Sequence, residues 1–310
     1  MVVTSRIQAP VLAGEYRPIY IPSPDVYRGP DTPCFRQGEE YLQWIVNDFS
    51  FLKDDKGVWH AIGITHPQPP RFTSAFDFDE TNIHEAESQL FHAVFEGSLR
   101  ELMKGGRMEE KEKLLYPQQR PGELPDCWAP AVFPWDSGYR MLYTPGSMRT
   151  AVSPDLYQWT PTGELFHSEN FGMRDPYVYV ENGIYHLIYN DGEILWHRET
   201  TDFAQMSEPR LLQSHTFGRL SAMESPCLIK RDGLYYLLWC IHDGQNGCYD
   251  NRTYVFASET LDGFDGRAPL ALLKGHAPEL ICEDGEWYIV SVHYPVNGLS
   301  IAPIRWEYVF

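Results

Sequence analysis

Short runs in which hydrophobic and polar residues alternate occur along most of the chain, and glycine-containing turns separate them. In one example, residues 177–180 and 184–189 form two such runs on either side of the turn Glu181-Asn182-Gly183. Alternation with a period of two is typical of half-buried strands, and glycine readily takes the positive φ of a tight hairpin. The pattern therefore predicts β-hairpins, and a third strand is expected after three of them, at residues 150–152, 194–198 and 253–257.

Four of the predicted hairpins begin in the same way, with a proline just before the first strand. These starts are Trp128-Ala129-Pro130, Arg174-Asp175-Pro176, Glu224-Ser225-Pro226 and His276-Ala277-Pro278. Their prolines are 46, 50 and 52 residues apart, and a turn glycine follows each one after seven or eight residues. A degenerate fifth copy, Asn47-Asp48-Phe49, has its turn glycine at Gly57. Multi-strand repeats of this length predict an all-β fold, a five-bladed β-propeller.

The repeats leave two stretches to be placed. Residues 1–40 are expected to form an N-terminal extension packed on the propeller, which would span residues 41–310 with an insertion at about 66–125 in the first blade. Within that insertion, residues 89–94 fit the third strand of the blade, although so short an apolar run also fits a helix. The charged run at residues 108–115 is predicted to be a short surface helix.

Composition and charge narrow the classes of partner. With 43 acidic and 25 basic residues the net charge is −18, and so acidic a surface would repel a phosphate backbone, so nucleic acid is not an expected partner. The sequence contains neither a secretory signal nor an apolar run of about 20 residues, so no membrane association is expected. The six cysteines form no CxxC pair, and a cytoplasmic location with free thiols is expected. The oligomeric state is left open.

The repeat also predicts a cluster of polar side chains. In a propeller the inner strands run along a central channel, so equivalent strand starts meet at one mouth of it. The residues brought together in this way are Asn47, Asp48, Trp128, Arg174, Asp175, Glu224 and His276. Three carboxylates in one small space are costly to desolvate, which points to a functional site rather than a solvated, charge-balanced plug. Paired carboxylates suit glycoside hydrolysis, in which one protonates the leaving oxygen and the other attacks the anomeric carbon or activates water.

These motifs resemble those of the five-bladed propeller glycosidases over about residues 40–308. Asn47-Asp48 and Arg174-Asp175-Pro176 are similar to the invertase and levanase branch (family 32 type), whereas Trp128-Ala129-Pro130 and His276 look more like the arabinanase and β-xylosidase branch (family 43 type). The resemblance implies that Asp48 is the nucleophile, Asp175 the transition-state stabiliser and Glu224 the general acid/base. It also implies substrate contacts from Asn47, Trp128, Arg174 and His276.

The function that the resemblance implies is the release of a terminal furanose from short oligosaccharides by a β-fructofuranosidase-like hydrolase. One alternative is an inverting α-L-arabinofuranosidase or β-xylosidase in which Asp48 is the general base. A sugar-binding propeller without activity and a transferase or phosphorylase are further alternatives. The departures from the invertase pattern are Phe49-Ser50, where Pro-Asn is usual, and Ser225, which follows Glu224.

Two histidines are candidates for the site, and the motifs also bear on cofactors. His92 follows an apolar pair and is a candidate for the pocket wall, with a core histidine as the alternative. His276 is expected on the channel axis, next to either water or a structural cation such as calcium, and no metal ligand is assigned. The sequence has no HExxH spacing and no phosphate-binding glycine loop, so no cofactor is expected.

Overall fold

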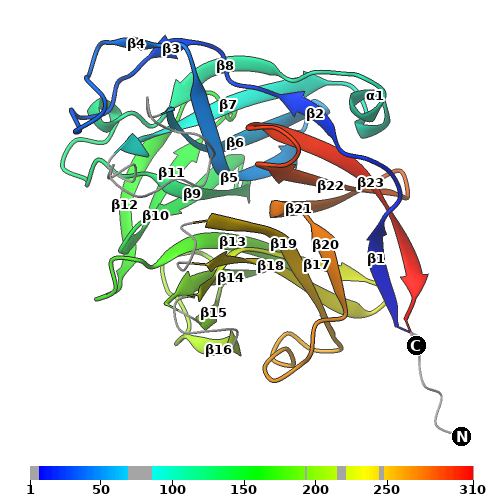
Figure 1. Cartoon of the computed structure of the whole chain (residues 1–310). Helices are drawn as coiled ribbons and strands as arrows, with labels where there is room; N and C mark the ends of the chain where they lie inside the picture. Colours follow the sequence, from blue (N-terminus) through cyan, green and yellow to red (C-terminus); the bar gives the residue numbers. More distant parts are fainter. Residues whose placement is uncertain (1–6, 69–85, 193, 215–220, 244–247, 310) are drawn as a thin grey trace, which may run out of the picture.

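Five β-sheets surround a central axis in the computed structural model, which describes residues 7–68, 86–192, 194–214, 221–243 and 248–309 (Figure 1). Four sheets have four strands each, and the fifth contains strands from both ends of the chain. All neighbouring strands within a sheet are antiparallel, as hairpin connections require. The predicted five-bladed propeller is confirmed.

Each blade begins with the strand nearest the axis and continues outward along the chain. Blade 1 consists of β5 (Trp44–Lys53), β6 (Val58–Pro67), β7 (Gln89–Glu96) and β8 (Glu109–Leu114). Blade 2 consists of β9 (Trp128–Trp135), β10 (Gly138–Thr144), β11 (Ser147–Ser153) and β12 (Thr160–His167). Blade 3 consists of β13 (Arg174–Glu181), β14 (Ile184–Asp191), β15 (Ile194–Thr200) and β16 (Arg210–Ser214). Blade 4 consists of β17 (Ser221–Arg231), β18 (Leu234–Asp243), β19 (Cys248–Ser258) and β20 (Ala271–Lys274).

Blade 5 joins the two ends of the chain. Its strands β21 (His276–Glu283), β22 (Glu286–Val292) and β23 (Leu299–Tyr308) are followed in space by β1 (Gln8–Leu12), which pairs with β23, as does β2 (Arg17–Tyr20). Figure 1 shows β1 beside β23 at the edge of the ring. Residues 8–20 therefore belong to the propeller, which corrects the expected boundary at residue 40. Only β3 (Asp25–Val26) and β4 (Glu40–Tyr41) form a separate small ribbon in this stretch.

The stretch expected as an insertion supplies the outer half of blade 1. The third strand predicted at residues 89–94 is confirmed as part of β7. The helix predicted at residues 108–115 is wrong, because Glu109–Leu114 is the outer strand β8, and charged side chains are common on such edge strands. A short helix lies earlier instead, α1 (Leu99–Met103), which starts with a capping box formed by Ser98 and Glu101. One turn of 3₁₀ helix follows at Pro117–Gln119, and residues 69–85 lie outside the described part.

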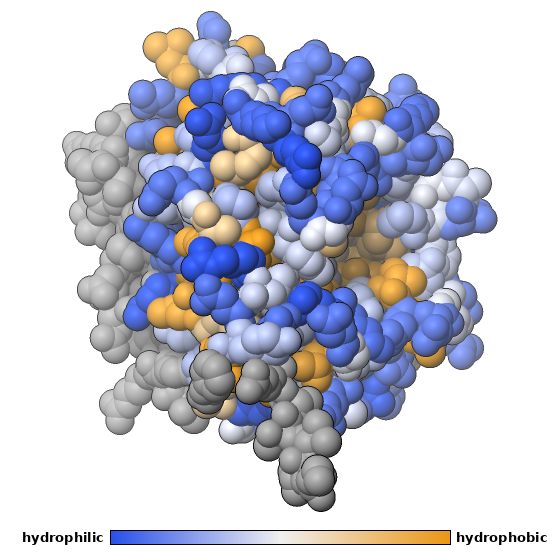
Figure 2. All heavy atoms as spheres, turned by 90° about the vertical axis from the view of Figure 1, so that its right-hand side faces the viewer, coloured by the Kyte–Doolittle hydropathy of each residue, from blue (hydrophilic) through white to orange (hydrophobic). Residues whose placement is uncertain are grey.

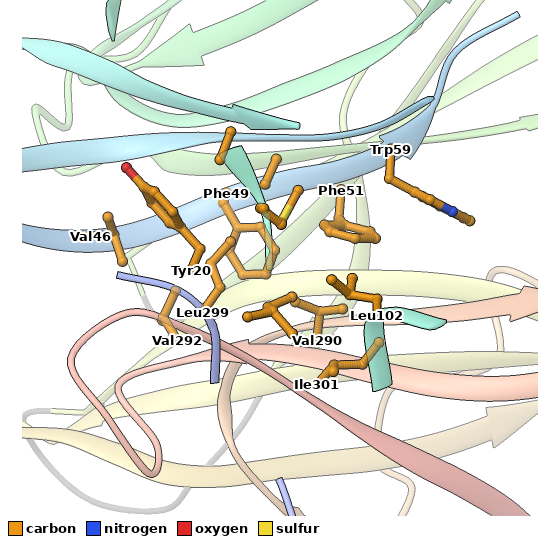
Figure 3. Packing of buried hydrophobic residues seen from close by; sticks show 14 of the residues in the cluster. Tyr20, Val46, Phe49, Phe51, Trp59, Leu102, Val290, Val292, Leu299 and Ile301 are labelled. Carbon is orange, nitrogen blue, oxygen red and sulfur yellow. The ribbon is translucent and has the colours of Figure 1, made fainter. Parts of the chain in front are cut away.

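Hydrophobic side chains fill the spaces between the blades. Figure 3 shows one such core, where β5 and β6 of blade 1 meet β22 and β23 of blade 5. Phe49 and Phe51 from the inner strand of blade 1 pack there against Val290 and Val292, and Leu102 of α1 closes the cluster. Phe49 thus contributes a buried ring at the position where the other four blades have proline.

The surface shown in Figure 2 is largely hydrophilic, with hydrophobic residues in small separate groups. Within the described residues, no helix has the length and apolar character needed to cross a membrane.

Candidate active site

A β-bulge occurs near the start of the inner strand in all five blades. The register between the first and second strands shifts by one residue between Val46 and Phe49 in blade 1 and at the matching place in each other blade. In four blades the residue before the proline has a positive φ, which is rare for residues other than glycine: Ala129, Asp175, Ser225 and Ala277. Bulges re-aim side chains and concentrate near functional sites, so the repeat builds one local geometry around the axis.

The three carboxylates predicted from the repeat come together here. Asp48 on β5, Asp175 on β13 and Glu224 on β17 are all buried. Ser225 links two of them, because its hydroxyl donates to Oδ1 of Asp48 at 2.5 Å and its backbone N–H donates to Oδ2 of Asp175 at 2.9 Å. The three acids therefore lie within a single small region, as the repeat register predicted.

Arg174 is the cation of this group. Its Nη2 and Nε atoms both donate to Oε1 of Glu224, at 2.6 and 3.2 Å, and its Nε lies 3.7 Å from Oδ2 of Asp175. Its Nη1 donates to the carbonyl of Gly172 at 3.0 Å, which fixes the direction of the guanidinium. One positive charge thus faces two of the three carboxylates.

The surroundings change how readily the two aspartates ionise. Burial and then the nearby Asp175 and Glu224 carboxylates raise the pKa of Asp48 well above its ordinary value. Burial also raises the pKa of Asp175 to about 7, although the Arg174 guanidinium opposes the shift. Both aspartates therefore keep their protons to higher pH than an exposed aspartate does.

Two residues near this group were not predicted from the sequence. Glu87 is a buried fourth carboxylate, whose charge contributes to the raised pKa of both Asp48 and Asp175. Phe171, 54% exposed, places its ring edge-on to Trp128 with 5.7 Å between the ring centroids. Neither belongs to the repeat motif: Glu87 precedes β7, and Phe171 precedes β13. The sequence carries no signal that would have found them.

Asn47, next to Asp48 in the chain, lies against a pair of histidines. Its Oδ1 lies 3.0 Å from Nε2 of His293, whose ring centroid is 5.7 Å from that of His276. His276 is fully buried, and its backbone N–H donates to the hydroxyl of Ser291 at 2.7 Å. These contacts hold Asn47 and His276 in place at the starts of two inner strands. The contacts with substrate expected of both residues stay predictions.

His276 lies beside the imidazole of His293 and the hydroxyl of Ser291, which donates to the His276 carbonyl, and the structural cation expected near it stays a prediction. Burial lowers the pKa of His293 well below its ordinary value, with His276 and His66 contributing in the same direction. Burial therefore favours the neutral form of the His293 ring.

The structure does not bring His92 to the carboxylates. Its Nε2 shares a 2.8 Å hydrogen bond with Nδ1 of His60, and its ring packs against those of His60 and Tyr157. Burial lowers the pKa of His92 to about 3, so the ring is neutral. The expectation that His92 lines the pocket is corrected, because the alternation of β7 directs this side chain into the packing between blades 1 and 2.

A cavity of about 30 Å³ lies where the five inner strands meet. Every blade contributes to its lining, which comprises Asp48 to Ser50, Ala129 and Pro130, Asp175 to Tyr177, Ser225 and Pro226, and Ala277 to Glu279. It has room for about one water molecule. Asp48 and Asp175 therefore line a small space on the axis.

This architecture is the five-bladed propeller found in solved structures of glycoside hydrolases. A thermostable family-43 glycoside hydrolase superposes with a TM-score of 0.64 at 15% identity, covering 86% of this chain and 91% of that one. An α-L-arabinofuranosidase from Podospora anserina superposes with a TM-score of 0.55 at 15% identity, covering 84% and 90%. A family-32 β-fructofuranosidase from Bombyx mori gives 0.54 at 15% identity, covering 86% and 61%.

These superpositions establish a shared fold. No family model matches the sequence. Both branches that the sequence motifs resemble are represented among the similar structures.

Proposed function

We propose that this protein is a glycoside hydrolase that removes a terminal furanose from an oligosaccharide. The observation that carries the proposal is the linked group of Asp48, Asp175 and Glu224, which comes from three different blades and is tied together by Ser225 and Arg174. Proteins seldom bury three acids together without a chemical task, because each loses its hydration.

In the proposed reaction, Glu224 gives its proton to the glycosidic oxygen as the bond to the anomeric carbon breaks. Asp48 attacks that carbon as a carboxylate and forms a glycosyl ester, and water then cleaves the ester while Glu224 takes back a proton. Asp175 accepts hydrogen bonds from sugar hydroxyls. The nearby carboxylates raise the pKa of Asp48, so the protonation of Asp48 depends on that of Asp175 and Glu224.

The pairing of Arg174 with Glu224 places a condition on this mechanism. Two hydrogen bonds from a guanidinium favour the charged carboxylate, whereas a general acid must carry a proton. The bound sugar therefore has to draw Arg174 away from Glu224, or toward Asp175, which is 3.7 Å from the same guanidinium. Arg174 would then act as a regulator of the proton on Glu224.

A β-fructofuranoside is the first candidate substrate, supported by Asn47-Asp48 and Arg174-Asp175-Pro176. The second candidate is an α-L-arabinofuranoside or β-xyloside, hydrolysed with inversion by a water that Asp48 activates. It is supported by the similarity of Trp128-Ala129-Pro130 and His276 to the arabinanase and β-xylosidase branch.

A screen of aryl glycosides and short fructans, with NMR that resolves the anomer released first, tests the proposal. A retained fructose product supports the first candidate, and an inverted arabinose or xylose supports the second. Asp48→Asn and Glu224→Gln proteins serve as inactive controls. Sugar binding by calorimetry without turnover of any substrate would instead support a binding propeller.

A further inference from the structure

Two histidines and a glutamate meet on one face of blade 3, away from the carboxylate group. His186 lies on β14, and His197 and Glu199 lie on β15. In the register, His186 is opposite Glu199, and Ile188 is opposite His197, so the three side chains point to the same side of the sheet. His186 pairs with Tyr179, five residues along β13 from Arg174, or about 16 Å at the rise of a strand. This group is therefore separate from the proposed active site.

The three nearest polar atoms form a compact triangle. Nδ1 of His186 lies 3.0 Å from Nε2 of His197, and Oε1 of Glu199 lies 3.5 Å from the first and 3.9 Å from the second. A tetrahedral zinc ion with ligands at about 2.0 to 2.1 Å holds neighbouring ligand atoms about 3.3 Å apart. The triangle has the size of one face of such a tetrahedron.

Blade 1 provides an internal comparison. His60 and His92 occupy the same places in β6 and β7 as His186 and His197 in β14 and β15, and Nδ1 of His60 lies 2.8 Å from Nε2 of His92. The position opposite His60 is Val94, where blade 3 has Glu199 opposite His186. The pair in blade 1 thus lacks the third ligand that the pair in blade 3 has.

We propose that His186, His197 and Glu199 bind a zinc ion that clamps the middle strands of blade 3. Two imidazole nitrogens and one carboxylate oxygen are a donor set that zinc accepts, and they leave a fourth position for water. Burial supplies neutral rings, since it lowers the pKa of His186 and brings that of His197 to about 4. Neutral imidazole is the form that binds a metal.

Two charged residues beside the group, Arg210 and Asp262, would influence zinc binding. Nη2 of Arg210 lies 2.5 Å from Oε1 of Glu199 and 3.3 Å from Nδ1 of His197, so this cation competes with the ion for the same glutamate. Arg210 is half exposed and has room to turn outward. Oδ1 of Asp262 lies 3.9 Å from Nδ1 of His197, beyond hydrogen-bond distance, and adds a nearby negative charge.

The test is zinc binding to the full-length protein after dialysis against a chelator, followed by calorimetry and thermal unfolding. We expect one equivalent to bind through this group and the melting temperature to rise with zinc concentration, as for any ligand of the native state. Glu199→Gln and His197→Gln should each lose this equivalent. Arg210→Ala should bind zinc more tightly than the wild type, because it removes the competing cation.

His92→Gln is the matched control, because it alters the equivalent pair in blade 1 and should leave the equivalent of zinc in place. Cobalt in place of zinc should give the visible absorption of a tetrahedral site in the wild type and lose it in Glu199→Gln. Undiminished binding in both Glu199→Gln and His197→Gln, or no stoichiometric binding to the wild type, would overturn the proposal.

Discussion

The hydroxyl of Ser225 donates a 2.5 Å hydrogen bond to Oδ1 of Asp48, across the axis from one blade to another. This bond favours the ionised carboxylate and partly offsets the burial that raises the pKa of Asp48. Ser225 stands at the point where the sequence departs from the invertase-like pattern. It therefore acts as a positioning residue for the proposed nucleophile.

We expect Ser225→Ala to raise the pKa of Asp48 further. A raised pKa leaves less carboxylate at low pH, so the acidic limb of kcat/KM should move to higher pH while the rate above the limb changes less. Ser225→Gly should give the same displacement, because it also lacks the hydroxyl, and it fits the positive φ of 49° better than alanine does. The profile measured on the best substrate checks this, and an unmoved limb in both variants would show that the hydrogen bond does not influence Asp48.

Asp48→Asn and Glu224→Gln should each lower kcat by about a thousandfold or more, since each removes a group needed in the transition state. Their melting temperatures should stay near the wild-type value, because both changes remove a buried charge and preserve the shape. Asp191→Asn is a matched control, since that carboxylate only accepts hydrogen bonds from Ser168 and Asn170 in a turn. Activity within tenfold of the wild type in either catalytic variant would reassign its role.

Arg174→Met should move the alkaline limb of the pH profile of kcat/KM to higher pH. Without the guanidinium, the ionised form of Glu224 loses two hydrogen bonds, so the residue holds its proton longer as the pH rises. Arg198→Met is the control, because Arg198 contacts Tyr189 and Ser207 instead of a carboxylate of the site. If both variants kept the wild-type limb, Arg174 would have no part in the protonation of Glu224.

The spacing of the repeated prolines and glycines was sufficient to predict the blades and the meeting of Asp48, Asp175 and Glu224. This succeeded because equivalent positions of a propeller are related by rotation about one axis, so register alone brings them together. The pairing of β1 with β23 was not predicted, since closure of the ring depends on contacts between residues almost 300 positions apart. The run Glu109–Leu114 was predicted to be helical, but charged residues suit an outer strand as well as a surface helix.

Contacts that do not repeat from blade to blade were not predicted from the sequence. Ser225 was noted only as a departure from a motif, whereas its two hydrogen bonds join two of the acids. Glu87 and His293 lie outside the strand starts, and only the folded chain brings them to the site. His92 is the core histidine that was weighed beside a place in the pocket wall, and its apolar flank could not decide between the two because it does not tell which face of a strand a histidine occupies.

Glu279 gives a prediction about stability, in a group that the proposed reaction does not use. It lies on β21 against the axial cavity, and burial raises its pKa to about 8, although a hydrogen bond with the Phe51 backbone opposes the shift. Its ordinary value is 4.5, so between pH 4.5 and about 8 the native state binds a proton that the unfolded state lacks. The free energy of unfolding therefore falls as the pH rises through this window.

Glu279→Gln keeps the shape of the side chain and stays neutral at every pH. The free energy of unfolding of this variant should therefore not fall through the titration of residue 279. We expect the variant to melt roughly 2 to 4 °C above the wild type at pH 8 and close to it at pH 5, as measured by calorimetry. Glu164→Gln changes the net charge equally at an exposed position and separates this local effect from the general repulsion in a chain of net charge −18. If the Glu279→Gln and Glu164→Gln curves ran parallel, Glu279 would titrate as an ordinary surface carboxylate and the buried charge would have no measurable cost.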